Sequence, residues 1–389
     1  MKDIPLIAID ALGIDQPGGA RTAILDLFNT LFKIRSRWRY LVFLSRSEPL
    51  LTSFPNVRQI VLPVRKGLLA RVLIQILMPY MVLRHNVDLV HFTKSQGGLV
   101  WGAKVVLTIF DVTTLRHPEL HSPQAVWVWR CLQPIVSRHA DAVVALSNNA
   151  AHDIHQILHV PEEKIAIVPC AAQSSCSAQL AGDSIVRIKA RYDLPERYML
   201  FVGILARKKN LLTLLRALSI LQERGIGFPP LILVGPRYRF SDASEEILEL
   251  VEELGLGQRV RYIGPVASNE LAPFYSAADI FLMPSIHEGF GIPCLEAMKC
   301  GTPVIASRAS ALPEVVGEAG LLVDDYMSPV AWAAQIARLL SDAELRADLA
   351  EKGESRAQRF TWERSAQMLA ALYERLLDIP HLGGISGFA

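Results

Sequence analysis

Short apolar runs alternate with longer amphipathic segments along the whole chain. In the first half the runs are rich in β-branched residues, and several are apolar at every position, which is typical of parallel strands buried on both faces. They predict strands at Leu6–Asp10, Tyr40–Ser45, Gln59–Leu62, Leu89–Phe92, Val105–Phe110, Ala142–Leu146 and Ile165–Val168. Helices are expected between them, for example at Ala20–Phe32, Leu68–Leu83 and Ala125–Arg138. This alternation indicates a parallel sheet with right-handed crossovers.

The alternation stops once and then begins again. Residues Ala171–Ser184 are small, polar and aperiodic, so we expect a linker there. Beyond it, strands are predicted at Met199–Gly203, Leu231–Gly235, Val260–Ile263, Ile280–Met283, Val304–Ser307 and Leu321–Val323. The helices expected between and after them are Asn210–Arg224, Ser244–Leu254, Ser268–Ala277, Pro293–Lys299 and Pro329–Leu340. A last helix, Thr361–Leu377, has no strand after it.

The pattern therefore predicts an α/β protein with two facing Rossmann-like parallel-sheet domains. We place the first domain at residues 1–178 and the second at 185–358, with a C-terminal helix at 359–380 that returns to the first domain. Ligands of open α/β sheets bind at the carboxyl ends of the strands. Functional residues should therefore directly follow strands and line a cleft between the domains.

Composition excludes several classes of protein. The 389 residues carry 40 Lys and Arg against 38 Asp and Glu, and 51% are hydrophobic, which excludes intrinsic disorder and a nucleic-acid binder that works by bulk charge. Five cysteines without a Cys-x-x-Cys pair favour a reducing, cytoplasmic location over a disulfide framework. The longest apolar run, Val72–Leu83, is too short to cross a bilayer, which needs roughly 20 residues. The amino-terminal segment is interpreted as a first strand, not a signal peptide.

The segment His287-Glu288-Gly289-Phe290-Gly291-Ile292-Pro293-Cys294-Leu295-Glu296 directly follows an apolar strand. Its glycines let the backbone turn tightly and approach a ligand, and its proline suits the first turn of a helix. Backbone N–H groups that open a helix form an anion site. The two carboxylates could accept hydrogen bonds from the hydroxyl groups of a sugar and a ribose. Either glutamate alone could equally be a capping carboxylate of an ordinary strand–loop–helix connection.

Cations and glycines follow two other predicted strands. Arg207, Lys208 and Lys209 come after Gly203 and precede a helix that begins at Asn210. Three cations at a helix N-terminus are unfavourable with the helix dipole, and a bound diphosphate would reverse that cost; a solvated basic cap is the alternative. Near the amino terminus Gly18 and Gly19 open a helix with Arg21 close by, which by itself is weak evidence for a site.

These segments together resemble the retaining nucleotide-sugar glycosyltransferases of family four, which have the GT-B fold. The two glutamates match the family's E-x7-E pattern, Phe201–Asn210 matches its strand, glycine loop and basic signature, and Leu312-Pro313-Glu314-Val315-Val316 matches a later Pro-Glu-Val segment. Pro17-Gly18-Gly19 resembles the glycine loop after the family's first strand. The C-terminal half of the resemblance is more specific than the N-terminal half.

The resemblance implies a role for each matching residue. Glu288, Lys209 and Asp111 would be catalytic, and Gly18, Gly19 and Arg21 would lie on the acceptor side. The donor would be held by Gly203, Arg207, Lys208, Lys209, Gly289, Phe290, Gly291, Ile292 and Glu296, with Glu296 on the ribose and Lys209 on the diphosphate.

Three positions depart from the family pattern. Phe110 stands where the family usually has a histidine that contacts the transferred sugar, and Lys208 stands where it usually has arginine, so the bidentate fork is lost. Pro169-Cys170-Ala171 replaces an interdomain Pro-Asn-Gly. The sugar contacts and the geometry of the hinge are therefore expected to differ from those of the family.

The implied activity is transfer of a hexose, possibly mannose, from a nucleotide diphosphate sugar to a glycan or lipid-linked acceptor in cell-surface polysaccharide synthesis. A nucleotide-sugar epimerase on the same fold and a non-catalytic sugar-nucleotide binding subunit are the alternatives. No cofactor is expected. No metal is expected either, because the chain has no Asp-x-Asp and His152, His155 and His159 fit the outer face of a helix. Arg65, Lys66 and Arg71 around Leu68–Leu83 leave open a peripheral association with the inner face of the cytoplasmic membrane.

Overall fold

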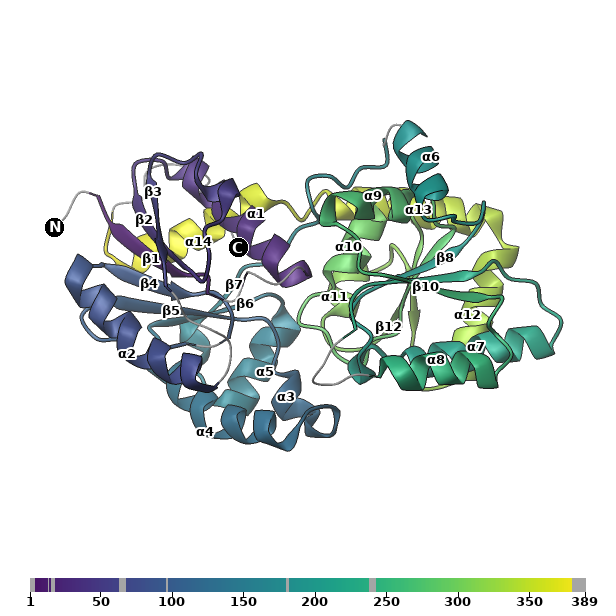
Figure 1. Ribbon diagram of the computed structural model, residues 1–389, viewed down its shortest axis with the longest axis horizontal. Helices are drawn as coiled ribbons and strands as arrows, with labels where there is room; N and C mark the ends of the chain where they lie inside the picture. The colour runs from purple at the N-terminus through teal and green to yellow at the C-terminus, as the bar shows by residue number, and fades with distance from the viewer. Residues whose placement is uncertain are drawn as a thin grey trace.

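The computed structural model describes residues 4–12, 14, 18–62, 68–95, 97–179, 182–237 and 243–379, without the side chains of 68–74. Within these residues the chain forms two parallel sheets, one in each half of the molecule (Figure 1). Pro17, Arg65 and Lys66 lie outside the described residues, as does the side chain of Arg71, so the structure does not bear on the predictions made for them. In the described part of the chain, no helix is long and apolar enough to span a bilayer.

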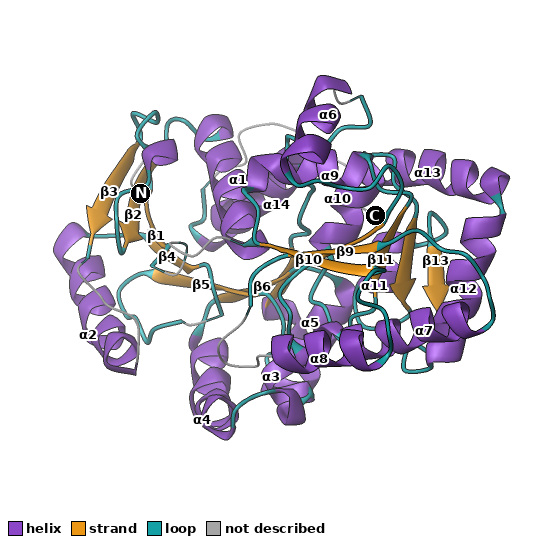
Figure 2. Cartoon of the chain, turned by 45° about the vertical axis from the view of Figure 1, so that its right-hand side comes forward, coloured by secondary structure: helices purple, strands orange, loops and turns teal. Residues whose placement is uncertain are grey.

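The first sheet has the strand order β3-β2-β1-β4-β5-β6-β7, and every neighbouring pair is parallel. Its strands are β1 Leu6–Asp10, β2 Arg39–Leu44, β3 Val57–Val61, β4 Leu89–Phe92, β5 Lys104–Ile109, β6 Ala142–Ala145 and β7 Ile165–Ile167. Its helices are α1 Gly19–Ile34, α2 Leu68–His85, α3 Thr113–Arg116, α4 Pro123–His139 and α5 Asn148–Leu158. In Figures 1 and 2, α1 covers one face of the sheet and α2, α4 and α5 cover the other.

The second sheet has the order β10-β9-β8-β11-β12-β13, again parallel throughout. Its strands are β8 Met199–Val202, β9 Leu231–Val234, β10 Val260–Gly264, β11 Ile280–Met283, β12 Val304–Ser307 and β13 Leu321–Val323. Its helices are α6 Gly182–Arg191, α7 Leu211–Glu223, α8 Ser244–Glu253, α9 Leu271–Ser276, α10 Ile292–Lys299, α11 Leu312–Val316, α12 Pro329–Ser341 and α13 Ala343–Ala357. The predicted α/β class and the two parallel-sheet domains are confirmed.

The segment expected to be a linker is packed more tightly than its composition suggests. Cys170 and Cys176 are buried in the same apolar cluster as α10, and α6 begins at Gly182, inside the range assigned to the linker. The backbone carbonyl of Gln173 accepts a hydrogen bond from Lys299 (3.1 Å). The small side chains of this segment allow it to pack closely against the second domain. Their lack of a helical or strand period is what predicted a linker.

The last helix, α14 (Trp362–Leu376), lies against α1 in the first half of the molecule (Figure 1). Glu374 on α14 pairs with Arg35 at the end of α1 (2.9 Å), and Ser365 donates a hydrogen bond to the carbonyl of Pro169 (2.7 Å). The buried Tyr373 hydroxyl lies 2.5 Å from a ring nitrogen of His91 on β4. The chain therefore crosses between the two halves twice, once before α6 and once before α14.

Candidate functional site

The carboxyl ends of three strands bring charged residues together between the two sheets. Asp111 follows β5 of the first sheet, Lys208 and Lys209 follow β8 of the second, and Glu288 follows β11, which is paired with β8. The backbone N–H of Ile286 donates to the carbonyl of Lys208 (2.9 Å), so the loops after β8 and β11 are tied to each other. Strand order thus places four charged side chains within one small volume.

Lys209 and Glu288 form an ion pair that is largely removed from water. The Lys209 ammonium lies 2.5 Å from a Glu288 carboxylate oxygen, and the two side chains are only 8% and 13% exposed. Burial by itself would raise the pKa of Glu288, but the charges of Lys209 and Lys208 outweigh it and hold that pKa below its ordinary value. The carboxylate is therefore ionised near neutral pH and can orient a hydroxyl or stabilise a cation.

A second ion pair crosses between the domains. The Lys208 ammonium lies 3.2 Å from a carboxylate oxygen of Asp111, and both side chains are mostly buried. Burial pushes the pKa of Asp111 upward, yet Lys208 and the hydrogen bonds from Thr113 hold it well below its ordinary value. Each lysine therefore faces a carboxylate, and a bound dianion would compete with both carboxylates for the two cations.

The loop that carries Glu288 is shaped by its glycines. Gly291 has φ +107° and precedes α10, a conformation that side chains rarely adopt. The backbone of Gly289 lies in close contact with the first domain, since a Cβ atom placed there would lie 1.6 Å from the carbonyl oxygen of Phe110. Phe290 is buried against Phe360, and Ile292 is the first residue of α10. Glycine at positions 289 and 291 therefore allows the loop to pack at the boundary between the two domains.

Glu296 lies in the interior. Its two oxygens accept hydrogen bonds from the side-chain amide of Gln173 (2.7 Å) and the hydroxyl of Tyr275 (2.9 Å). Burial raises the pKa of its carboxyl to about 7, and the half-buried Asp26 on α1 adds to this rise. Sequence reasoning missed Gln173, because it stands in the expected linker, and Tyr275, because nothing near it in the chain indicates a site. The contact of Glu296 with a ribose stays a prediction.

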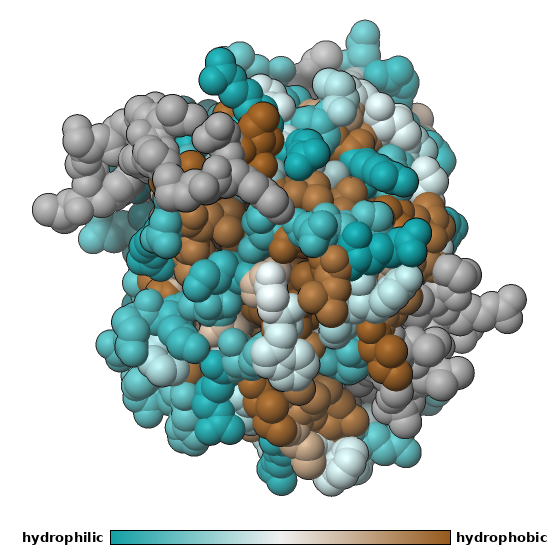
Figure 3. Space-filling model, turned by 90° about the vertical axis from the view of Figure 1, so that its left-hand side faces the viewer, coloured by the Kyte–Doolittle hydropathy of each residue, from teal (hydrophilic) through white to brown (hydrophobic). Residues whose placement is uncertain are grey.

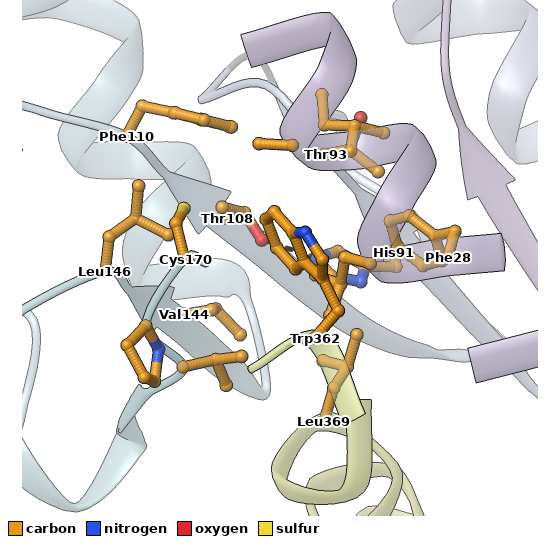
Figure 4. Close-up of a pocket in the computed structure, with 15 residues that line it drawn as sticks. Phe28, His91, Thr93, Thr108, Phe110, Val144, Leu146, Cys170, Trp362 and Leu369 are labelled. Carbon is orange, nitrogen blue, oxygen red and sulfur yellow. Dashed lines mark hydrogen bonds between the residues drawn. The ribbon is translucent and has the colours of Figure 1, made fainter. Parts of the chain in front are cut away.

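Phe110 lines a small apolar cavity of about 20 Å³, together with residues of the first sheet, α1 and α14 (Figure 4). In Figure 4 it projects from the end of β5, while Trp362 lies beside Thr108 and His91. Within the described residues the buried indole N–H of Trp362 has no hydrogen-bond partner. Burial lowers the pKa of His91 to about 3, so this histidine is neutral. The cavity has room for about one water molecule.

The remaining predicted residues surround this centre at different distances. Gly203 directly follows β8 in the loop that leads to the two lysines. Its carbonyl leaves room only for glycine at position 235, where an added Cβ would lie 2.0 Å from the carbonyl oxygen. Arg207 is exposed and pairs with Glu246 of α8 (3.2 Å), so its guanidinium is engaged outside the charge cluster. Gly18 and Gly19 are exposed at the start of α1.

Two further predicted groups are placed as follows. Arg21, on the first turn of α1, forms an ion pair with Glu48 of the first domain. His159 has a left-handed backbone at the end of α5 and does not continue the helical face of His152 and His155. Among the described residues, no three His, Cys, Asp or Glu side chains are grouped so that they could hold a metal ion.

Comparison with known proteins shows which family the chain belongs to. Residues 185–356 match the model of glycosyl transferases group 1, and residues 17–173 match that of glycosyltransferase family 4. An O-antigen chain mannosyltransferase B of Escherichia coli is 30% identical over 277 residues, which cover 70% of this chain and 71% of that protein. The chain belongs to the family-4 glycosyltransferases.

Two further proteins are similar to this chain. A D-inositol 3-phosphate glycosyltransferase of Corynebacterium urealyticum is 34% identical over 65% of the chain, and the match spans 61% of the length of that relative. The solved structure of Anabaena HepE in complex with UDP and glucose superposes with a TM-score of 0.75 at 21% identity, covering 95% of this chain and 100% of the other. The GT-B fold that the motifs predict for this chain is thereby confirmed.

Proposed function

We propose that the protein transfers a hexose from a nucleotide diphosphate sugar to an acceptor with retention of configuration. The pairing of two largely buried lysines with two carboxylates at the meeting point of both sheets carries this proposal. A diphosphate entering between the lysines replaces Asp111 and Glu288 as their counter-ion. The carboxylates are then free to face the sugar and the acceptor.

In this reaction the bond between the anomeric carbon and the diphosphate oxygen breaks, and a bond to the acceptor hydroxyl oxygen forms on the same face of the sugar. The hydroxyl proton passes to the departing diphosphate. Negative charge grows on the diphosphate, where Lys208 and Lys209 already lie, and positive charge grows on the sugar, near Glu288. Charges fixed in advance at these positions stabilise the transition state in an environment with little water. Two lysines supply the countercharge, so the proposed reaction needs neither a metal nor a cofactor.

The acceptor side of the proposal rests on the first domain. Asp111 follows β5 at the carboxyl edge of its sheet, Gly18 precedes α1, and Gly19 is the first residue of α1. The names of the similar proteins, an O-antigen mannosyltransferase and a structure with UDP and glucose, support a nucleotide sugar as donor and a glycan or lipid-linked acceptor. Mannose as the sugar and cell-surface polysaccharide as the product are part of this proposal.

A lipid-linked acceptor fits a protein that works at the inner face of the cytoplasmic membrane. Ile76, Tyr80 and Leu83 of α2 are exposed, and Figure 3, which looks onto the α2 end of the molecule, shows apolar side chains gathered in patches there. Apolar side chains on a surface helix can enter the interfacial region of a bilayer. Co-sedimentation with anionic vesicles, compared between the wild type and Leu83→Asp, tests this association.

The decisive experiment is a donor screen. Thermal unfolding is measured with GDP, UDP, ADP and dTDP sugars, because a ligand that binds only the folded state raises Tm. Each donor that raises Tm is then incubated with the protein alone and with glycan acceptors. A new glycosidic bond supports the transferase, an isomerised sugar without acceptor would identify an epimerase, and binding without turnover would identify a binding subunit.

A further inference from the structure

The first turn of α5, in the first domain, is occupied by a carboxylate from the second domain. Glu314 on α11 accepts hydrogen bonds from the backbone N–H groups of Asn148 (2.8 Å) and Asn149 (2.5 Å), and from the side-chain amide of Asn148 (3.0 Å). The first N–H groups of a helix have no partners within it, and the helix dipole favours a negative charge there. One glutamate therefore satisfies this helix end across the domain boundary.

The same helix end also holds the loop that carries Glu288. The hydroxyl of Ser147, the residue before α5, accepts from the N–H of Ala150 (3.0 Å) and donates to the carbonyl of Gly289 (2.9 Å). Ser147 is buried, so this contact is shielded from water. Two separate segments of the second domain, α11 and the 287–291 loop, thus meet the first domain at one place.

Glu314 and Glu288 are joined through a short stretch of backbone. The N–H of Glu288 donates to the hydroxyl of Ser310 (2.7 Å), and the N–H of Ala311 donates to the carbonyl of Glu288 (3.4 Å). Ala311 directly precedes α11, which begins at Leu312. A displacement of α11 is therefore transmitted to the backbone of Glu288.

The helix that bears Glu314 is itself held firmly within the second domain. The guanidinium of Arg356 on α13 donates to the backbone carbonyls of Glu314 and Val315 (2.5 Å each). The next residue after α11, Gly317, is so close to this guanidinium that a Cβ would lie 2.7 Å from it. α11 therefore moves with the second domain. The contact between Glu314 and α5 can form only when the two domains are close together.

We propose that Glu314 is a positioning residue for the transfer reaction. By seating its carboxylate on the N-terminus of α5, it fixes the closed arrangement of the domains and sets the Glu288 carboxylate and the Lys209 ammonium at their working positions. The inference rests on the function proposed above. It assigns a role to a glutamate that has none in the reaction proposed above.

Glu314 is suited to such a role because neither domain needs it in order to fold. Its side chain is half-buried and belongs to none of the apolar clusters, and its carboxylate accepts hydrogen bonds from α5 of the first domain. Losing it should therefore change how often the domains are closed, and leave each domain folded. Asp342 offers a matched comparison, because its carboxylate accepts from the N–H of Leu345 (2.8 Å) at the start of α13, within one domain.

The experiment compares Glu314→Ala and Glu314→Gln with Asp342→Ala and the wild type. UDP-glucose and GDP-mannose are the probes, and kcat and KM are measured by release of nucleotide diphosphate. We expect kcat to fall about tenfold in Glu314→Ala, the usual weight of one helix cap, with a smaller loss in Glu314→Gln, which keeps one acceptor oxygen. Donor KM should change by less than about twofold, since the lysines remain. Asp342→Ala should lower Tm and leave kcat at the wild-type value.

Hydrogen exchange supplies a readout that does not depend on turnover. The amides of Asn148 and Asn149 should exchange faster in both Glu314 variants and be unchanged in Asp342→Ala. Wild-type kcat in Glu314→Ala, with Tm lowered as in Asp342→Ala, would show an ordinary cap and overturn the inference. A wild-type protein that turns over no sugar nucleotide would refute the proposed function instead, and the exchange rates would still show whether the contact exists in solution.

Discussion

Replacing Gly289 by alanine tests whether the site is assembled by contact between the domains. The added Cβ would lie 1.6 Å from the carbonyl oxygen of Phe110, whereas real Cβ atoms keep at least 3.0 Å from such neighbours. The loop or the whole domain therefore has to retreat by more than about 1 Å. A displacement of that size at a catalytic group costs on the order of a hundredfold in rate.

The cost should appear in activity more than in folding. Forcing extra atoms into a packed core costs about 1–3 kcal/mol, but a clash between two domains is relieved when they separate. We expect kcat of Gly289→Ala to fall about a hundredfold while Tm changes little. Gly227→Ala is the control, because a Cβ at Gly227 meets no atom within 4 Å. Wild-type turnover in Gly289→Ala would refute the closed arrangement as the working one.

Three further predictions concern the charged groups. Lys209→Ala should lower turnover about a hundredfold with the fold intact, because one transition-state contact is lost; unchanged kinetics would remove Lys209 from the diphosphate site. Glu288→Gln should lower mainly kcat and Glu296→Gln mainly donor affinity, measured by steady-state kinetics, and equal small effects would make both structural caps. EDTA should leave activity intact, and strict restoration of lost activity by Mg²⁺ or Mn²⁺ would show that the lysines are not the charge stabiliser.

Much of the fold follows from the sequence because most of its strands are apolar along their whole length. Ile280–Met283, Val304–Ser307 and Leu321–Val323 are apolar or small throughout, and the structure has strands with these bounds. Helix α13 was not predicted because its sequence is rich in charged residues and only three of its residues are buried. The short helices α3 and α11 are too brief to show a helical period.

The charged centre could be anticipated in part. Glu288, Lys208 and Lys209 each follow a strand, and the carboxyl ends of parallel strands lie at one edge. The pairing of each lysine with its carboxylate depends on the strand order and on how the domains meet. A local sequence pattern predicts neither of these. Gln173, Tyr275 and Ser310 were missed for the same reason, since their partners lie 21 to 123 residues away in the chain.

Glu296 shows how this placement should make stability depend on pH. Burial raises the pKa of its carboxyl from 4.5 to about 7, so between these values the folded protein holds a proton that the unfolded chain releases. The contribution of Glu296 to the free energy of unfolding is fully present below about pH 4.5 and is lost as the pH rises through 7. This loss amounts to roughly 3 kcal/mol. Glu296→Gln stays neutral, so in urea unfolding it should match the wild type near pH 5 and exceed it near pH 8. An equal stability difference at both pH values would mean that Glu296 is ionised throughout, held so by the hydroxyl of Tyr275 and the amide of Gln173.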